Sequence, residues 1–339
     1  MARATAVVVG AGSISGAWFG PLAAENVVIK GVVDLSRDAA ERRIDEFGLD
    51  CPASTDLART LRRTRPDFVV DLTMPEAHCS VTCTALRAGC HVVSEKPMAA
   101  SMAEARRMVR TAERTGRLYM VSQSRRWNAL HDRVRRAVRS RRLGELTTAN
   151  CDFYIGAHFG GFRDKMPSPL ILDMAIHHFD LARFITGCDP VAVYAQEFNP
   201  KGSWYLGDVA ASCIFEMSDG VVFTYRGSWC AEGCHTSWNG DWRLIGTRGT
   251  LLYDRDQEPH GQVVAPGRSG LSRSLKPVKV PLSPLRYPGM HGALREMLAF
   301  LRTGKTPQTE CHDNIRSLAM VFAAMESSRK GRRVPVRAL

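Results

Sequence analysis

The chain has 339 residues, of which 45% are hydrophobic and 24% charged, and its formal net charge is +12. A chain of this length usually organises more than one hydrophobic core, so we expect two domains. No apolar run approaches the ~18 residues that cross a membrane. The N-terminal segment MARATAVVVGAG does not have the pattern of a secretory signal. These features predict a globular protein with no membrane partner.

The positive charge is carried mainly by arginine, which outnumbers lysine 38 to 8. Thirteen of the arginines lie between Arg106 and Arg142, a density that nucleic-acid-binding proteins can also have. However, only Tyr119 and Trp127 stand among them as aromatic residues, and many of the arginines fall where a helix would face solvent. We therefore expect no nucleic-acid partner, and interpret the arginines as solvated helix faces that also attract an anionic cofactor.

The cysteine pattern indicates the compartment and argues against a metal site. Ten cysteines form no CxxC motif, which is typical of free thiols in a reducing compartment, so we expect a cytoplasmic protein. His78, Cys79 and Cys83 could be drawn as metal ligands, but no second ligand pair stands at zinc spacing. We expect no bound metal.

The first part of the chain alternates short apolar strands with amphipathic helices. Strands are expected at 5–10, 27–34, 68–72, 91–94 and 118–121. Helices are expected at 15–24, 37–47, 57–63, 78–88 and 102–115. Because each helix follows a strand closely, this pattern predicts βαβ units and a doubly wound parallel sheet.

The second part of the chain is richer in strands. They are expected at 146–156, 191–198, 209–217, 221–229 and 242–245, with Asp219-Gly220 as a tight hairpin turn. The stretch 259–288 is rich in Pro, Gly and Ser and predicts a long loop, and helices at 291–303 and 312–330 close the chain. Such strands favour a mostly antiparallel, open sheet.

We therefore expect an α/β fold of two domains. Residues 1–123 would form the doubly wound parallel-sheet domain, and residues 124–339 an α+β domain that binds substrate and mediates oligomerisation. The sequence leaves open whether the helix that closes the chain packs against the first domain.

A glycine-rich turn follows the first strand and opens a helix. Gly10 permits the tight turn, Gly12 lets the backbone approach a pyrophosphate, and Ser15 replaces the third glycine of the dinucleotide-binding pattern. Asp34 ends the next strand, where a carboxylate bonds the ribose hydroxyls and disfavours a 2′-phosphate. Arg37 would instead accommodate that phosphate. The sequence thus predicts a Rossmann domain that prefers NAD, with NADP not excluded.

The stretch ILDMAIHHFDLARFITG, residues 171–187, is the expected helix between the first two strands of the second domain. Asp173 and His177 are four residues apart, so they share one face of a helix. Three interpretations stand: a metal site with Asp180, an acid/base pair, or polar residues at an ordinary helix start. A metal is disfavoured because one helix supplies every ligand. His178 would point about 100° away from His177 and is interpreted as structural.

Several ordered motifs carry a resemblance to the Gfo/Idh/MocA family of sugar and inositol oxidoreductases. They are TMPEAH (73–78), AGCHV (88–92), EKP (95–97), SQSRRWNAL (122–130), the pair Asp173 and His177, and the tail 303–336. The sequence departs from the family pattern at Met74 and Ala129, where prolines are usual. The resemblance covers nearly the whole chain.

The resemblance implies a Rossmann domain, a mostly antiparallel second sheet, a nicotinamide dinucleotide, and hydride transfer at a sugar or polyol hydroxyl. It also implies a homodimer or homotetramer formed through the open face of the second sheet. Two alternatives stay open: an enzyme whose tightly bound NAD drives elimination or glycoside cleavage by transient oxidation, and a dinucleotide-binding regulator without turnover.

The expected roles follow from these motifs and from the chemistry of alcohol oxidation. His177 is the candidate base because an imidazole titrates near neutrality. Lys96 is expected to stabilise the alkoxide that forms, and Asp173 to position the imidazole or a substrate hydroxyl. The expected cofactor-binding residues are Gly10, Gly12, Ser13, Ile14, Asp34, Arg37, Thr73, Pro75, His78, Glu95, Lys96, Pro97 and Gln123. The expected substrate-binding residues are Lys96, Arg126, Tyr154, Asp173 and His177.

Overall fold

The computed structural model describes residues 3–267 and 270–339, which form two compact units. Unit 1 comprises Met1–Trp127, Tyr287–Leu318 and Ala338–Leu339, and unit 2 comprises Asn128–Arg286 and Ala319–Arg337. The first unit thus runs slightly past the expected boundary at residue 123 and takes in a C-terminal segment. Residues 1–2 of the expected first domain and 268–269 of the expected loop lie outside the described residues.

Unit 1 is built on a six-stranded sheet in which every pair of neighbouring strands is parallel. The strand order is β3-β2-β1-β4-β5-β6. The strands are β1 (Thr5–Val9), β2 (Val28–Val33), β3 (Ala53–Ser54), β4 (Phe68–Asp71), β5 (His91–Ser94) and β6 (Tyr119–Val121). This confirms the doubly wound sheet. Because all strands run the same way, the loops after β1, β4, β5 and β6 meet at one edge, where ligands of open α/β sheets bind.

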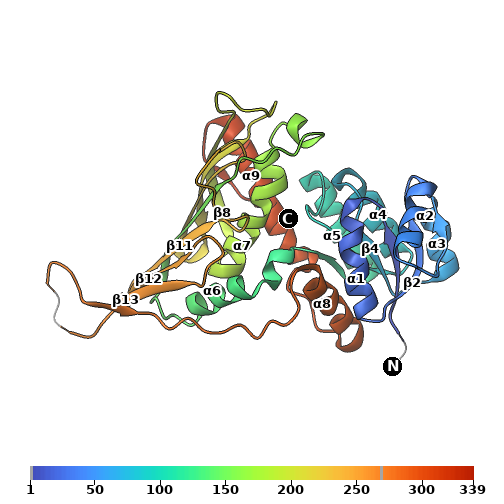
Figure 1. Ribbon diagram of the computed structural model, residues 1–339, viewed down its shortest axis with the longest axis horizontal. Helices are drawn as coiled ribbons and strands as arrows, with labels where there is room; N and C mark the ends of the chain where they lie inside the picture. Colours follow the sequence, from blue (N-terminus) through green and yellow to red (C-terminus); the bar gives the residue numbers. More distant parts are fainter. Residues whose placement is uncertain (1–2, 268–269) are drawn as a thin grey trace. The chain divides into compact units, whose positions relative to one another are not determined.

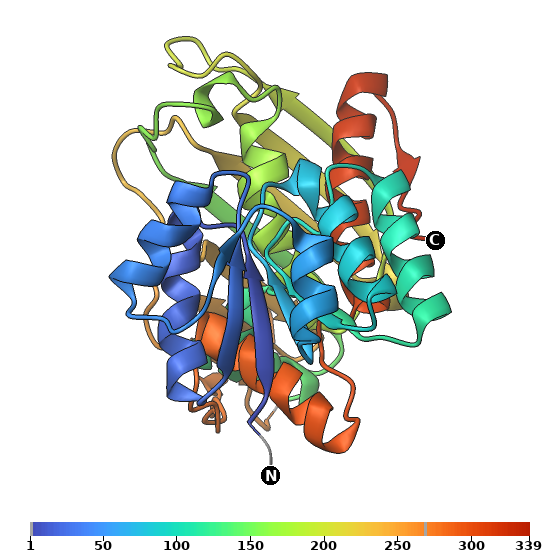
Figure 2. The ribbon, with the colours of Figure 1, turned by 90° about the vertical axis from the view of Figure 1, so that its right-hand side faces the viewer.

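Helices cover both faces of this sheet (Figure 2). Three begin at a side chain that accepts a hydrogen bond from a backbone N–H in the first turn: Ser36, Asp56 and Ser101. The helices are α1 (Gly16–Ala24), α2 (Arg37–Glu46), α3 (Leu57–Thr64), α4 (Pro75–Arg87), α5 (Met102–Thr115), α8 (Gly289–Thr303) and the start of α9 (Cys311–Lys330). Short 3-10 turns, η1 (Ser13–Ser15) and η2 (Ser124–Trp127), follow β1 and β6.

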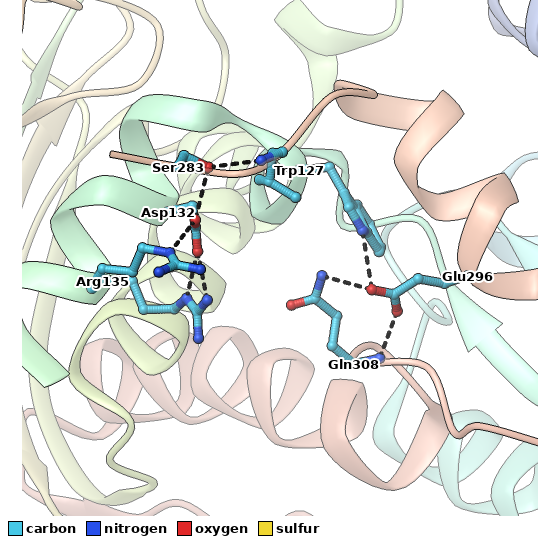
Figure 3. A network of polar contacts seen from close by, with 8 residues as sticks. Trp127, Asp132, Arg135, Ser283, Glu296 and Gln308 are labelled. Carbon is cyan, nitrogen blue, oxygen red and sulfur yellow. Dashed lines mark hydrogen bonds and ion pairs between the residues drawn. The ribbon is translucent and has the colours of Figure 1, made fainter. Parts of the chain in front are cut away.

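Glu296 ties the C-terminal segment of unit 1 to the residues that follow β6. Its Oε1 accepts hydrogen bonds from Trp127 Nε1 (3.3 Å) and Gln308 Nε2 (3.1 Å), and its Oε2 accepts one from Gln308 N (2.8 Å; Figure 3). A Cβ on Gly292 would lie 2.4 Å from the Trp127 ring, so α8 approaches that ring as only glycine allows. This contact explains why residues 287–318 belong to unit 1.

Unit 2 is built on a nine-stranded mixed sheet with the order β14-β13-β12-β11-β7-β10-β9-β8-β15. Only the β7–β10 pair is parallel among the strands described, so the mostly antiparallel sheet is confirmed. The strands are β7 (Leu146–Tyr154), β8 (Pro190–Phe198), β9 (Ala210–Met217), β10 (Val222–Ser228), β11 (Asp241–Gly246), β12 (Gly249–Tyr253), β13 (His260–Val264), β14 (Leu275–Pro277) and β15 (Val334–Pro335).

Two expectations about unit 2 are wrong. The stretch 259–288 is not one long loop, because β13 pairs with β12 and β14 pairs with β13 inside it. The region 171–187 is not a regular helix, because a π-helical turn, η4 (Leu170–Ala175), precedes α7 (Ile176–Thr186). A further helix, α6 (Ala129–Arg139), was not among the expected elements.

The helices of unit 2 lie along one face of the sheet (Figure 1). Phe179 of α7 packs its ring against Phe215, Phe223 and Tyr225, with centroids 4.9, 6.2 and 5.3 Å away. A short 3-10 turn, η3 (Arg163–Lys165), lies between β7 and η4, and another, η5 (Ser218–Gly220), forms the hairpin between β9 and β10. In the described part of the chain, no helix has the length and hydropathy needed to cross a membrane.

A substitution of Phe179 tests this core. Phe179→Ala should lower the free energy of unfolding of unit 2 by about 3–5 kcal/mol, because it removes a fully buried ring and leaves a cavity. The matched control Phe162→Ala removes a ring that is 52% exposed, so its cost should stay below ~1 kcal/mol. Denaturant unfolding followed by circular dichroism measures both; equal costs would contradict the core described here.

Candidate active site

The glycine turn of unit 1 has the shape that a dinucleotide needs. Gly10 has φ +98°, and a Cβ there would lie 2.7 Å from the Leu72 carbonyl group, so no other residue fits. Nothing lies within 4 Å of a Cβ built on Gly12, which is exposed together with Ser13. The backbone at Gly12 is therefore open to a bulky ligand, at the start of the η1 and α1 helical segment.

Asp34 joins this turn to the start of α2 through its two carboxylate oxygens. Its Oδ2 accepts a hydrogen bond from Ala11 N (2.7 Å), and its Oδ1 accepts one from Ser36 N (2.9 Å). Arg43, which was not among the expected residues, donates to Ala11 O (3.2 Å) and Gly12 O (3.1 Å). Arg37 instead pairs with Glu41 on the exposed side of α2, so its contact with a cofactor stays a prediction.

His78 connects the loops after β4 and β5. Its Nδ1 lies 2.9 Å from Pro97 O and its Nε2 lies 2.9 Å from Thr73 O, and the ring is fully buried. Asp71 accepts hydrogen bonds from Thr73 Oγ1 (2.6 Å) and Thr82 Oγ1 (3.0 Å), and burial raises its pKa. The ring nitrogens of His78 are therefore engaged in holding Thr73 and Pro97 in place.

Glu95 and Lys96 follow β5 at the same edge of the sheet. Glu95 is 8% exposed and accepts a hydrogen bond from Trp18 Nε1 of α1 (2.9 Å). Burial raises the pKa of Glu95, against the opposing effect of the Trp18 hydrogen bond. The Lys96–Pro97 peptide is cis, and Lys96 is partly exposed. Glu95 thus joins this loop to α1 through Trp18, next to the partly exposed Lys96.

Gln123 provides an independent sign that this edge receives a ligand. Its side-chain oxygen and nitrogen are both buried, and neither has a hydrogen-bond partner among residues 3–267 and 270–339. A buried amide without partners is costly, and a ligand with polar groups would satisfy it. The open Gly12 backbone, the Asp34 carboxylate and this amide all fit a nicotinamide dinucleotide.

Arg126 is buried and contacts the C-terminal segment of unit 1. It is 4% exposed, donates from Nη1 to Gln308 O (2.8 Å), and forms an ion pair from Nη2 with Asp313 (2.7 Å). These contacts anchor the C-terminal segment of unit 1. A contact between Arg126 and the substrate stays a prediction.

Two expected residues of unit 2 lie at the start of a buried helix. Every residue of α7 is buried except His177 and Thr186, and Asp173 on the preceding π turn is also partly exposed. His178 is fully buried between Phe153 and Tyr225, with ring centroids 4.9 and 5.5 Å away, which agrees with the structural role expected for it. A π turn is rare and frequently marks a functional site.

Arg163 is the residue that sequence reasoning missed in this region. Its Nε donates a hydrogen bond to Asp173 Oδ2 (2.7 Å), and the two side chains are 34% and 15% exposed. Its guanidinium carbon lies 4.9 Å from the centre of the Phe159 ring and 4.8 Å from that of Phe162. The available signal was the stretch FGGFRD, in which one arginine follows two aromatic residues in a glycine-containing loop.

Tyr154 is not brought to the side of the sheet on which α7 lies. Along β7, Cys151 and Phe153 are buried beneath the helices, so the alternation of a strand directs Tyr154 to the opposite, open face. The contact of Tyr154 with a substrate stays a prediction. Asp173, His177 and Tyr154 stay the predicted substrate-binding residues of unit 2, and Arg163 contacts the first of them.

Comparisons with known proteins agree with both units. Residues 4–123 match the family model described as "Oxidoreductase family, NAD-binding Rossmann fold", and residues 131–252 match the "GFO/IDH/MocA C-terminal domain". The D-apiose dehydrogenase of Paraburkholderia graminis is 27% identical over 84% of this chain and 76% of its own. The 1,5-anhydro-D-fructose reductase of Ensifer adhaerens is 25% identical over 96% of both chains.

A solved structure has the same fold over nearly the full length. It is an oxidoreductase from Agrobacterium radiobacter in complex with NAD+, L-tartaric acid and magnesium. Its TM-score to this chain is 0.86 at 21% sequence identity, covering 99% of each chain.

A substitution of Asp34 tests the cofactor half of the site. Asp34→Ala should weaken NADH binding by about 10- to 100-fold, because a charged acceptor is worth roughly 1.5–3 kcal/mol. It should also narrow the preference for NADH over NADPH, because the repulsion of a 2′-phosphate is lost. Fluorescence titration with both cofactors measures this. Asp38→Ala, on the exposed first turn of α2, is the control, and an unchanged NADH affinity in Asp34→Ala would remove Asp34 from the ribose site.

Proposed function

Because the chain belongs to the Gfo/Idh/MocA oxidoreductase family and carries its NAD-binding Rossmann fold, we propose that it transfers a hydride between NAD and a sugar or polyol hydroxyl carbon. The observation that carries this proposal is the partly exposed pair Asp173 and His177, at the start of a helix that is otherwise buried. A protein that only binds the dinucleotide has no need of this pair.

The proposed roles follow from the chemistry of each side chain. Bound NAD supplies the hydride acceptor. His177 takes the hydroxyl proton, because a neutral imidazole is a competent base near neutral pH. The Lys96 ammonium stabilises the developing alkoxide, and Asp173 binds a substrate hydroxyl or orients the imidazole. Arg163 keeps the Asp173 carboxylate in one orientation through their 2.7 Å hydrogen bond.

The cofactor preference and the cellular location belong to the same proposal. The Asp34 carboxylate supports NAD over NADP, while Arg37 leaves some binding of NADP open. All ten cysteines are free thiols, which suits the reducing environment of the cytoplasm.

We also propose that the chain forms a homodimer or homotetramer through the open face of its nine-stranded sheet. Apolar side chains on β8, β9 and β10 are 38–51% exposed on this face: Val191, Tyr194, Phe198, Ile214 and Val222. Apolar side chains gathered on one face of a sheet indicate an interface. A second copy of the same sheet face would cover it symmetrically.

Substitutions of the proposed acid/base residues test turnover. His177→Gln and Lys96→Ala should each lower kcat by about 10²–10⁴-fold, the usual contribution of a proton-transferring group, with NADH affinity nearly intact. The reduction of NAD is followed by absorbance across sugars, inositols and sugar acids. His260→Ala, an exposed histidine on β13, should match the unsubstituted protein. If the two site variants also matched it, the assignment would fail.

A charge on the open face tests the assembly. Ile214→Asp should convert the oligomer to monomers, because it places an unpaired carboxylate in an apolar contact. Light scattering after size-exclusion chromatography measures the mass. Leu282→Asp, at a 77% exposed position outside the sheet, should leave the oligomer unchanged. An Ile214→Asp protein with unaltered mass would place the interface elsewhere.

A further inference from the structure

Three side chains of the kinds that bind metals stand together where α9 begins, within unit 1. Glu310, Cys311 and His312 each offer one ligand atom, and these three atoms all lie within 4.8 Å of one another. Glu310 Oε1 lies 2.9 Å from Cys311 Sγ and 2.7 Å from His312 Nδ1, and the sulfur lies 3.7 Å from that nitrogen. We call Glu310, Cys311 and His312 the α9 cluster.

The spacing of these atoms is close to that of a tetrahedral zinc site. Zinc bonds of ~2.3 Å to sulfur and ~2.0 Å to nitrogen or oxygen place neighbouring ligand atoms roughly 3.3–3.5 Å apart. The separations in the α9 cluster lie on both sides of this value, so side-chain shifts of about half an ångström would admit the ion. Thiolate, imidazole and carboxylate are also the ligand types that zinc accepts in proteins.

Glu113, near the end of α5, contacts the other nitrogen of the His312 ring. Its Oε1 lies 2.9 Å from His312 Nε2. A carboxylate at one ring nitrogen favours the tautomer with its proton there, which leaves a lone pair on Nδ1, the nitrogen that faces Cys311 and Glu310. Metal-binding histidines almost always have such a partner. Glu310 Oε2 accepts a hydrogen bond from His312 N (3.0 Å), which leaves Oε1 as the ligand atom.

Asn314 gives an independent sign of a ligand at this place. It is fully buried, and neither its side-chain oxygen nor its nitrogen has a hydrogen-bond partner in the described part of the chain. Asn314 stands three residues after Cys311, so both side chains share a face of α9, and helical side chains lean toward the N-terminus. The amide therefore covers the turn that carries the thiol, where water bound to a metal ion would satisfy it.

The charges and the position of the α9 cluster suit a structural ion. A thiolate and a carboxylate together balance the charge of a divalent cation, and the N-terminus of a helix favours the thiolate form of a cysteine. Helix α5 returns from the cofactor edge of the sheet to the opposite edge, and Glu113 lies in its last turn but one. The ion would therefore join α5 to α9 away from the proposed site of hydride transfer.

We propose that Glu310, Cys311 and His312 bind one zinc ion through Oε1, Sγ and Nδ1, with a water molecule as the fourth ligand. Cys311 binds as the thiolate and His312 as the neutral imidazole, so their protons pass to solvent when the ion binds. Glu113 is a positioning residue that accepts the hydrogen bond from Nε2. The sequence analysis looked for paired ligands at zinc spacing, whereas these three ligands are consecutive residues.

Zinc and cobalt titrations of the whole chain test the site. The protein is first treated with a chelator, and Zn²⁺ is then titrated in competition with a chromogenic chelator. We expect one tightly bound zinc per chain. Co²⁺ in its place should give the ultraviolet charge-transfer absorption of a cobalt–thiolate bond. A protein that binds no zinc, and whose His312 then only bridges Glu113 and Glu310, overturns the inference.

Cysteine variants locate the thiolate. Cys311→Ser should abolish the cobalt–thiolate absorption and weaken zinc binding about 100-fold or more, because it removes the soft ligand. Cys234→Ser changes an exposed cysteine outside the α9 cluster, so it should keep both properties. Absorption that persists in Cys311→Ser would place the metal on another thiol and contradict the assignment.

Variants of the partly exposed His312 and of Glu113 keep the test independent of the buried cysteine. Zinc should raise the melting temperature of the unsubstituted protein but not that of His312→Gln. Glu113→Gln should weaken zinc binding by about 10- to 100-fold while retaining the cobalt–thiolate absorption. Glu76→Gln, at an exposed position on α4, is its control. An equal rise in His312→Gln would exclude the site, and an unchanged zinc affinity in Glu113→Gln would exclude the positioning role.

Discussion

Nearly complete burial of α7 constrains every polar side chain that it carries. A buried polar group must find hydrogen-bond partners within the protein, or it destabilises the fold. His178 packs between two aromatic rings, and Asp173, just before the helix, accepts a hydrogen bond from Arg163. His177, like Asp173, keeps partial access to solvent. The same packing that fixes the helix against the sheet therefore fixes the position of the candidate base.

In unit 1, contacts of polar side chains fix the positions of loops rather than of a helix. The buried His78 ring joins the loops after β4 and β5, and Glu95 joins the second of them to α1 through Trp18. Asp34 does the equivalent for the glycine turn and the start of α2. These contacts fix the loops at the edge of the sheet where we propose that the cofactor binds, so little conformational freedom would be lost on binding.

Local patterns in the sequence were sufficient for most of the fold and for the outline of the site. The glycine turn, the βαβ alternation and the Asp219-Gly220 hairpin are encoded by neighbouring residues, and the structure and the family models confirm the resulting fold class and cofactor. Strands β13 and β14 were missed because their pairing with β12 is tertiary, while their composition resembles that of a loop. The π turn was missed because Asp173 and His177 are four residues apart, a spacing that predicts a regular α-helix.

The site residues show the same limit of sequence reasoning. Arg163 stands ten residues before Asp173, a separation that no helical or strand periodicity links, so only the folded loop reveals their hydrogen bond. Tyr154 ends β7, and the sequence alone does not give the face of the sheet on which it lies, because that depends on which side the helices cover. The roles of Lys96, Asp173 and His177 stay predictions.

The most direct test of the central claim follows one hydrogen atom. The protein is mixed with NAD and a cyclic sugar deuterated at its ring carbons, and the NADH formed is examined by NMR. The account predicts that the NADH carries deuterium at its transferable position, and that His177→Gln slows this transfer without changing where the deuterium goes. NADH formed without deuterium, or transfer at an unchanged rate in His177→Gln, would contradict it.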